Sequence, residues 1–449
     1  MAKTITVLGT GYVGLTTAAL LANSGYKVFA VEINKERLDV IKQGRSFFFE
    51  EGLDPVIKAG IDSGNLIATD SYELAVPDSD VIFSCVGTPD NPDGSSNLEY
   101  VFGSAKQAAS LAKDNAIFVQ KSTVPVGTGD KIISSFKEEG KKISYVSNPE
   151  FLRESTALYD TLYFDRIVVG GESQTAVQAI LDIYKQLENS RDQIADIAKI
   201  EKSETTGRYI ATKLISAELI KVTANAFLAL KISFSNSIAK LSDSAGADIN
   251  EVMDAVGADP RIGRAFLNAG RGFGGGCFPK DVSGLISSGL ENGIDLDIMQ
   301  AVQSVNKSMP GYIVEKMKGA FGGSFKDKQV AVLGLAFKSG TSDTRKSPGI
   351  ALANLLARQG AKVKAYDPEA SEEAKPDVNN KVQIVNDLES AAKDSDAVLI
   401  VTDWAEFTDT PVDQYAGLMR GKLFVDGMNC FDPEAIKAAG LQYIGVGRG

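Results

Sequence analysis

Apolar residues along this chain form short continuous runs that alternate with stretches where they recur every three or four positions. Residues 3–33 have the pattern of a strand, a glycine turn, a helix that stops at Gly25, and a second strand. Further apolar runs separate the helical stretches, at 80–87, 115–123, 142–149 and 165–171. Such runs are typical of buried parallel strands, so roughly the first 190 residues are predicted to form a doubly wound α/β domain.

The rest of the chain predicts a helical segment and then a second α/β domain. The stretch from Tyr209 to Ala245 contains no Gly or Pro, and we expect it to form one long helix, kinked or straight. After a linker at 321–328, residues 329–338 restart the pattern of strand, turn and helix. The predicted fold is therefore α/β, with two Rossmann-like doubly wound domains joined by a helical middle domain with a long central helix. The expected domains are 1–200, 201–323 and 324–449.

Composition narrows the choice of partners. The 449 residues, 44% of them hydrophobic, suffice for two or three domains, and a formal net charge of −11 gives no basic field for nucleic acid. No stretch has transmembrane length and the N-terminus does not resemble a signal peptide, so we expect a cytoplasmic protein with no membrane partner. Three scattered cysteines predict neither disulfides nor a metal site. Because histidine is absent, acid–base chemistry falls to Asp, Glu, Lys, Cys or water.

A dinucleotide site is predicted at the first turn. Gly9, Gly11 and Gly14 form GxGxxG between a strand and a helix, where a pyrophosphate can approach the helix NH groups. Glu32 ends the second strand, at the spacing of a carboxylate that binds the adenosine ribose diol and repels a 2′-phosphate, so NAD is expected. Arg37 either flanks the adenine or is an exposed helix residue. The predicted cofactor contacts also include Tyr12, Val13, Thr88, Thr123 and Glu154.

The segment GFGGGCFPKD, at 272–281, is unlike a core segment, because consecutive glycines leave no side chains to pack. We infer that something needs the backbone close there. A helix that starts near Pro279 places Cys277 at its N-terminus, where the helix dipole favours a thiolate. Asp281 is near enough to share a site with the sulfur. A lone cysteine is otherwise an inert buried residue, which is how we interpret Cys85.

Two further polar groups are candidates. Lys221 and Asn225 share one face of an apolar helix, where they are expected to be buried and either stabilise an oxyanion or form a structural polar cluster. Glu150 and Glu154 follow one strand end and Thr123 ends another, at the edge where open α/β sheets bind ligands. Each of these taken singly also fits a helix cap or a solvated face.

Together a nicotinamide site, a nucleophilic cysteine and an oxyanion pair indicate oxidation of an alcohol beyond the aldehyde. An aldehyde cannot release hydride until a nucleophile adds to it. Thiolate addition gives a thiohemiacetal whose alkoxide expels hydride, and water then releases an acid from the resulting thioester. This chemistry requires no histidine.

Seven motifs carry a resemblance to a known family, in this order: GTGYVGL, STVPVGT, NPEFLRE, ELIKVTANAFLALKISFSN, DPRIG, GFGGGCFPKD and LGLAFKSGTSDTRKSP. The chain resembles the UDP-glucose/GDP-mannose 6-dehydrogenase family, most closely its UDP-glucose 6-dehydrogenases. The resemblance implies oxidation of UDP-glucose at C6 to UDP-glucuronate by two NAD, as used in polysaccharide biosynthesis. It also implies a homodimer formed through the middle domain.

The same resemblance implies roles for single residues. Cys277 is the nucleophile, Lys221 and Asn225 stabilise the oxyanion, and Asp281 handles a proton or orients water. Thr123, Glu150 and Glu154 bind or activate water. The residues that it assigns to the ligands are Phe151, Leu152, Arg153, Phe266, Leu267 and Gly274 around the sugar nucleotide, Arg261 at a neighbouring subunit's substrate, Lys338 at the diphosphate, and Arg345 at cofactor or substrate.

Three positions depart from the family pattern. Met428 stands where an arginine is usual, so an expected phosphate or ribose contact is missing. Ser155 replaces a common glycine, and Gly276 replaces a common serine.

Two alternatives stay open. One is another nucleotide-sugar 6-dehydrogenase, acting on GDP-mannose or a UDP-N-acetyl sugar. The N-acetyl branch tends to carry a histidine beside its cysteine, which this chain does not have. The other is a catalytically silent NAD or nucleotide-sugar sensor, which would not need a thiol.

Overall fold

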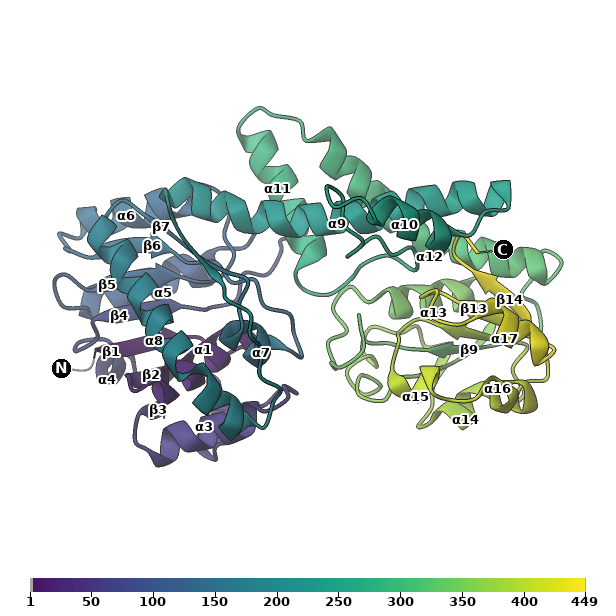
Figure 1. The fold of residues 1–449 in the computed structure, drawn as a ribbon, viewed down its shortest axis with the longest axis horizontal. Helices are drawn as coiled ribbons and strands as arrows, with labels where there is room; N and C mark the ends of the chain where they lie inside the picture. Colours follow the sequence, from purple (N-terminus) through teal and green to yellow (C-terminus); the bar gives the residue numbers. More distant parts are fainter. Residues whose placement is uncertain (1–2, 449) are drawn as a thin grey trace. The chain divides into compact units, whose positions relative to one another are not determined.

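The computed structural model describes residues 3–448. The chain divides into two compact units, 1–224 and 225–449, and the division falls inside the longest helix, α9 (Leu214–Ala245). Each unit is built around its own sheet (Figure 1). Within the described residues, no helix is both long enough and apolar enough to cross a membrane. The three-domain division expected from the sequence stays a prediction.

The first unit contains an eight-stranded sheet in the order β3-β2-β1-β4-β5-β6-β7-β8. Its strands are β1 (Thr4–Leu8), β2 (Lys27–Val31), β3 (Leu66–Thr69), β4 (Val81–Ser84), β5 (Ile117–Gln120), β6 (Ser144–Ser147), β7 (Arg166–Gly171) and β8 (Arg208–Thr212). Strands β1 to β6 are mutually parallel, and β8 is parallel to β7. The first six strands have the doubly wound order 3-2-1-4-5-6 of dinucleotide-binding folds.

Helices cover both faces of this sheet. They are α1 (Tyr12–Asn23), α2 (Lys35–Lys42), α3 (Leu53–Asp62), α4 (Tyr72–Ala75), α5 (Glu99–Leu111), α6 (Thr128–Glu138), α7 (Ala157–Leu162) and α8 (Gln174–Ala198). One hydrophobic cluster joins the sheet to α1, α3, α7 and α8, and another joins it to α4, α5 and α6. Successive residues of β1 enter different clusters, because side chains of a strand alternate between its faces.

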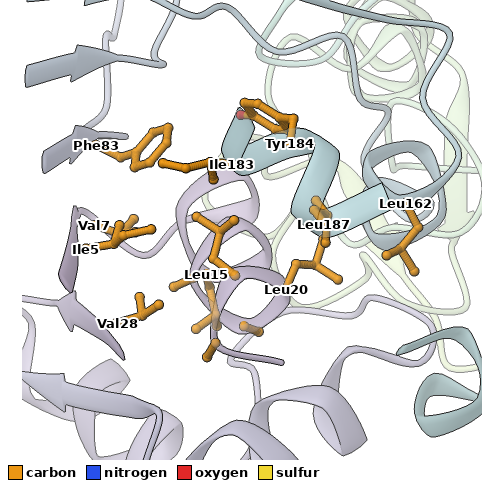
Figure 2. Packing of buried hydrophobic residues seen from close by; sticks show 14 of the residues in the cluster. Ile5, Val7, Leu15, Leu20, Val28, Phe83, Leu162, Ile183, Tyr184 and Leu187 are labelled. Carbon is orange, nitrogen blue, oxygen red and sulfur yellow. The ribbon is translucent and has the colours of Figure 1, made fainter. Parts of the chain in front are cut away.

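Helix α1 is apolar nearly all round and is enclosed by protein. Figure 2 shows α1 between the strands and α8: Leu15 and Leu20 belong to α1, Ile5, Val7 and Val28 to the strands, and Ile183 and Leu187 to α8. The enclosed position fixes the N-terminus of α1, and therefore the glycine turn before it, relative to the carboxyl ends of the strands.

Two sequence expectations are corrected here. Strand β7 is antiparallel to β6, so the run at 165–171 is not one more parallel strand beside its predecessor. The expected helix from Tyr209 begins only at Leu214, because residues 208–212 form β8 along β7. The segment RYIAT contains an aromatic and two β-branched residues, which suit a strand, and the pairing with β7 overrides the helical pattern.

The second unit contains a six-stranded parallel sheet in the order β11-β10-β9-β12-β13-β14. Its strands are β9 (Gln329–Leu333), β10 (Lys362–Tyr366), β11 (Val382–Ile384), β12 (Ala397–Ile400), β13 (Leu423–Asp426) and β14 (Gln442–Gly445). Its helices, besides the end of α9, are α10 (Ile249–Gly257), α11 (Phe278–Glu291), α12 (Asp297–Ala320), α13 (Pro348–Arg358), α14 (Leu388–Ala392), α15 (Ala405–Thr408), α16 (Val412–Leu418) and α17 (Pro433–Ala438). The predicted second Rossmann-like domain is confirmed.

Two buried carboxyls link helices of the first unit to loops. Glu218 on α9 accepts hydrogen bonds from the NH groups of Gly127 and Gly129, at 2.7 and 2.8 Å, at the start of α6. Glu50 accepts one from the NH of Leu158, at 2.9 Å, at the start of α7. Burial raises the pKa of each carboxyl to about 7, because the backbone hydrogen bonds only partly offset the lost hydration.

We predict that Glu50 makes the stability of the protein depend on pH. Its folded pKa of about 7 exceeds its ordinary value of 4.5, so its contribution is fully present below pH 4.5 and is lost as the pH rises through 7. Glu50→Gln, which mimics the protonated carboxyl, should therefore reduce the fall in unfolding free energy between pH 5 and pH 8. Urea denaturation at both pH values measures this.

The matched control is Glu51→Gln, because Glu51 is exposed and its loss changes the net charge equally. The control should keep the wild-type pH dependence. An equal pH dependence in Glu50→Gln and wild type would contradict the prediction.

Candidate active site

The phosphate-binding turn has the geometry that GxGxxG requires. Gly9 has a φ of +84°, which favours glycine, and its NH donates to the carbonyl of Val31 at 3.0 Å. A Cβ on Gly14 would lie 1.9 Å from the carbonyl oxygen of Gly9, so only glycine lets α1 pack this close. A Cβ on Gly11 would meet no atom within 4 Å. The open space at Gly11, at the N-terminus of α1, suits a pyrophosphate.

The carboxylate of Glu32 lies at the end of β2 and is only 6% exposed. It accepts hydrogen bonds from the hydroxyl of Thr10 at 2.5 Å and from the NH of Asn34 at 2.8 Å. Its remaining lone pairs can accept the two hydroxyls of a ribose. Arg37 is exposed and its guanidinium lies 4.7 Å from the ring centroid of Phe47. The residues of this turn therefore fit an NAD adenosine.

The other predicted cofactor residues lie at the expected edge. Tyr12 and Val13 begin α1, and the ring of Tyr12 lies 4.1 Å from that of Phe48. Thr88 follows β4 and Thr123 follows β5, and both are partly buried. Because β4 and β5 are parallel neighbours, both threonines follow the same edge of the sheet.

Glu150 and Lys221 form a buried ion pair. Their carboxylate and ammonium atoms lie 2.9 Å apart, and the side chains are 11% and 5% exposed. Glu150 also accepts a hydrogen bond from the NH of Leu152 at 2.8 Å, and the Lys221 ammonium lies 5.5 Å from the ring centroid of Phe151. The sequence indicated both residues but not their pairing. The pairing offsets the cost of burying either charge alone.

The loop after Glu150 is held by its own polar contacts. Arg153 forms a bidentate ion pair with Asp160 at 2.6 to 2.9 Å, and its side chain is largely exposed. Glu154 is partly buried. Ser155 has a φ of +73°, a conformation that costs a serine about 1 kcal/mol and a glycine nothing. This conformation explains why glycine is suited to position 155.

Cys277 and Asp281 lie at the start of α11, as predicted. Cys277 is the N-cap residue and is exposed, and the helix begins at Phe278. The carboxylate of Asp281 is 3% exposed and accepts hydrogen bonds from the Asn225 amide at 2.6 Å and from the Lys280 ammonium at 2.7 Å. Asn225, itself 6% exposed, thus belongs to the cysteine site, and Lys280 is a contact that sequence analysis missed.

The glycine run before Cys277 is explained by the segment that packs against it. A Cβ on Gly274 would lie 2.4 Å from the carbonyl oxygen of Lys346, and one on Gly275 would lie 2.8 Å from the Phe337 ring. A Cβ on Gly276 would lie 2.5 Å from the guanidinium carbon of Arg345. The sequence implied that something lies close to this backbone, and the structure shows that it is a segment of the same chain. A serine at 276 would displace Arg345.

A cavity of about 250 Å³ lies beside this run, within the second unit. It is lined by Ile232, Phe266, Asn268, Ala269, Gly270, Arg271, Gly272, Phe273, Gly274, Phe278, Phe337, Lys338 and Met428. Phe266, Gly274 and Lys338 were predicted for the ligand. Arg271 and the three further phenylalanines were not individually assigned a ligand contact, although they lie within or beside quoted motifs. Aromatic walls with a few polar groups are typical of small-molecule sites.

The remaining predicted residues lie as follows. Leu267 is 3% exposed and its side chain belongs to the hydrophobic core, so it does not line the cavity. Arg261 is 86% exposed and forms an ion pair with Asp259. Arg345 forms an ion pair with Asp343 at 2.6 Å. Among residues 3–448, no three acidic, Cys or His side chains are arranged to hold a metal ion.

Comparison with protein families gives three matches along the chain. All belong to the UDP-glucose/GDP-mannose dehydrogenase family: its NAD binding domain matches residues 3–188, its central domain residues 215–308, and its UDP binding domain residues 331–433.

Similar proteins cover nearly the whole chain. A UDP-glucose 6-dehydrogenase of Bacillus subtilis (strain 168) is 39% identical over 99% of this chain and 97% of its own length. A UDP-glucose 6-dehydrogenase of Rhizobium meliloti (strain 1021) is 36% identical over 99% of both chains. The solved UDP-glucose dehydrogenase of Pyrobaculum islandicum is 37% identical, with a TM-score of 0.88 over 100% of this chain and 98% of its own. The chain therefore belongs to the UDP-glucose/GDP-mannose dehydrogenase family, whose first domain binds NAD.

Proposed function

We propose that this protein oxidises the C6 alcohol of UDP-glucose to the carboxylate of UDP-glucuronate with two NAD. The observation that carries the proposal is the site at the start of α11. There an exposed cysteine at a helix N-terminus lies one turn before a buried carboxylate that is fixed by Asn225 and Lys280. An alcohol dehydrogenase that stopped at the aldehyde would need no such nucleophile.

Residues of the first unit would hold the cofactor. The open backbone at Gly11 takes the pyrophosphate, and Glu32 takes the ribose hydroxyls. When bound, NAD would supply the hydride acceptor for both oxidations, so that one alcohol, one water and two NAD⁺ would give one carboxylate, two NADH and three protons.

The chain's own residues handle the oxygen atoms and protons. Lys221 and Asn225, one turn apart on α9, stabilise the negative charge that develops on the C6 oxygen. Glu150 holds the Lys221 ammonium in place, as their 2.9 Å ion pair indicates. Thr123 and Glu154 hold or activate the water that takes the alcohol proton.

Cys277 carries the carbon through the second oxidation. Its sulfur forms a bond to C6 of the aldehyde, and the resulting alkoxide loses hydride to leave a thioester. Water then attacks the carbonyl carbon, the bond from sulfur to C6 breaks, and the acid leaves. Asp281 orients this water or takes its proton, while the amide of Asn225 keeps the carboxylate in position.

Two alternatives are weighed against this proposal. A substrate other than UDP-glucose keeps the same chemistry, and a solved UDP-D-ManNAc dehydrogenase of Pyrococcus horikoshii has a TM-score of 0.85 at 27% identity, over 99% of both chains. The 37 to 39% identity to enzymes named for UDP-glucose favours that sugar. A silent sensor is disfavoured because the exposed Cys277 lies at a helix N-terminus one turn before the buried Asp281, and binding alone needs no such thiol.

We also propose a cytoplasmic homodimer. Phe227, Phe234 and Leu241 on α9 are 58%, 47% and 64% exposed, and they recur every seven residues. Residues seven apart lie on nearly the same side of a helix, so these three form an apolar stripe in the second unit. An apolar stripe of this kind on a long helix is typical of a surface that pairs with a second copy.

The first prediction from this proposed function concerns stoichiometry. With UDP-glucose limiting and NAD in excess, two NADH should form for each UDP-glucose consumed, as measured by NADH absorbance. One NADH per sugar would indicate an enzyme that stops at the aldehyde. No NADH from UDP-glucose but two from GDP-mannose, run in parallel, would keep the chemistry and change the substrate.

The second prediction concerns the thiol. Cys277→Ser should lower acid formation by at least about a thousandfold, because a serine hydroxyl is a poor nucleophile without an adjacent base. NAD affinity should be unchanged. The matched control is Cys430→Ser, since Cys430 is also an exposed cysteine and should be dispensable. Full turnover by Cys277→Ser would rule out the thioester route.

The third prediction concerns assembly. Leu241→Glu places a charge in the stripe and should shift the protein from dimer to monomer in sedimentation experiments. Gln442→Glu, which adds the same charge at an exposed residue of β14, should stay dimeric. A Leu241→Glu protein that sediments as wild type would show that the stripe is not the dimer surface.

A further inference from the structure

Arg271 lines the cavity of the second unit and is an unusually placed charge. It is 6% exposed, and it lies in the same cavity wall as Lys338 and Met428. Its backbone NH donates to the carbonyl of Gly427 at 2.8 Å, which holds it beside Met428. Neither the composition nor the glycine pattern of the sequence indicated a function for this residue.

The guanidinium is fixed by three backbone carbonyls. Its Nε donates to Val401 at the end of β12, its Nη1 to Gly272 at 3.0 Å, and its Nη2 to Phe337 at 2.7 Å. A guanidinium has five NH donors, so one NH on each of Nη1 and Nη2 is not used by the described residues. Because the group is held rigidly, any ligand atom that it binds is placed precisely relative to β9 and β12.

No carboxylate of the described residues forms an ion pair with this guanidinium. Asp403 attracts it only from a distance and instead accepts a hydrogen bond from the Ser339 hydroxyl at 2.8 Å. Burial lowers the pKa of Arg271 to about 10. A buried cation without an anion is costly, and such charges are normally paired. The cavity beside it is the place from which an anion can reach it.

We propose that Arg271 binds the diphosphate of the nucleotide sugar in this cavity. This inference rests on the proposed function, since it takes the substrate to be a nucleoside diphosphate sugar. The two unused NH donors point to a bidentate contact with phosphate oxygens, which guanidinium geometry favours. Lys338 contributes a second positive charge to the same cavity.

The proposal also accounts for Met428. An arginine is usual at this position in the family. The methionine therefore predicted that a phosphate or ribose contact is missing. Met428 and Arg271 line one cavity, so the cation is present but is carried by the glycine loop instead of by the segment after β13. An uncharged side chain at 428 avoids placing two guanidinium groups together in a small cavity.

A purely structural role for Arg271 makes a different prediction. If the guanidinium only tied the loop to the three carbonyls, its replacement would weaken the binding of any ligand that uses the cavity, charged or neutral. A role in phosphate binding would instead affect UDP far more than uridine. The comparison of these two ligands therefore separates the roles.

The test uses the full-length protein and isothermal titration with UDP and uridine. Arg271→Met should weaken UDP binding by roughly 10- to 100-fold, as expected for the loss of a charged bidentate contact, and change uridine binding by less than about threefold. Arg271→Lys, which keeps the charge but not the fork, should lose less affinity for UDP than Arg271→Met. Urea denaturation of each variant checks that the second unit, which contains Arg271, is folded.

A double variant tests the exchange of positions directly. Arg271→Met combined with Met428→Arg should recover UDP affinity to within about tenfold of wild type, because the cation returns to the same cavity. Equal losses for UDP and uridine in Arg271→Met, or UDP affinity within about twofold of wild type, would overturn the proposal.

A structure of the wild-type protein with UDP needs no variant and settles the case if Arg271→Met does not fold. A phosphate oxygen within hydrogen-bonding distance of Nη1 or Nη2 supports the proposal, and a guanidinium with no phosphate contact overturns it. Wild-type protein that binds no UDP would instead defeat the proposed function, and this inference with it. UDP binding that is indifferent to Arg271 would defeat this inference alone.

Discussion

Close packing of a helix on a strand turn, possible only through glycine, is the constraint on which both units depend. In the first unit a Cβ on Gly14 would lie 1.9 Å from the carbonyl oxygen of Gly9, and in the second a Cβ on Gly349 would lie 2.2 Å from that of Gly334. The same contact occurs once in each unit, directly after β1 and directly after β9. This contact fixes the position of the start of α1 and of α13 relative to the carboxyl ends of the strands, where the candidate residues lie.

The acidic residue at the end of the second strand has different hydrogen-bond partners in the two units. Glu32 at the end of β2 accepts two hydrogen bonds and keeps room for a ribose. Asp367 at the end of β10 is 1% exposed and accepts the NH groups of Leu335 and Ala336 with one oxygen and two further NH groups with the other. The carboxylate of Asp367 is therefore used by backbone NH groups of its own loop and of the turn after β9, and that sheet can serve another ligand.

Charge pairing organises the candidate chemistry. Lys221 is paired with Glu150, and Asp281 is paired with Lys280 and hydrogen-bonded to Asn225, so each buried charge has a partner that fixes its position. Arg271 has no carboxylate partner among the described residues, and it lies in a cavity wall. A buried cation that is held only by backbone carbonyls is well suited to meet an anionic ligand that enters this cavity.

The sequence by itself determined the two α/β sheets, the GxGxxG turn with Glu32, and the place of Cys277 at the start of α11, because these depend on residues close together in the chain. It did not determine the direction of β7, the strand at 208–212, the pairing of Lys221 with Glu150, or the contact of Asp281 with Asn225, because each depends on a segment distant in sequence. Only the tertiary structure explained the glycine run and the burial of Arg271. Both result from contacts of segment 337–346 and the end of strand β12 with a loop that lies more than sixty residues earlier in the chain. A local sequence pattern does not predict such a contact.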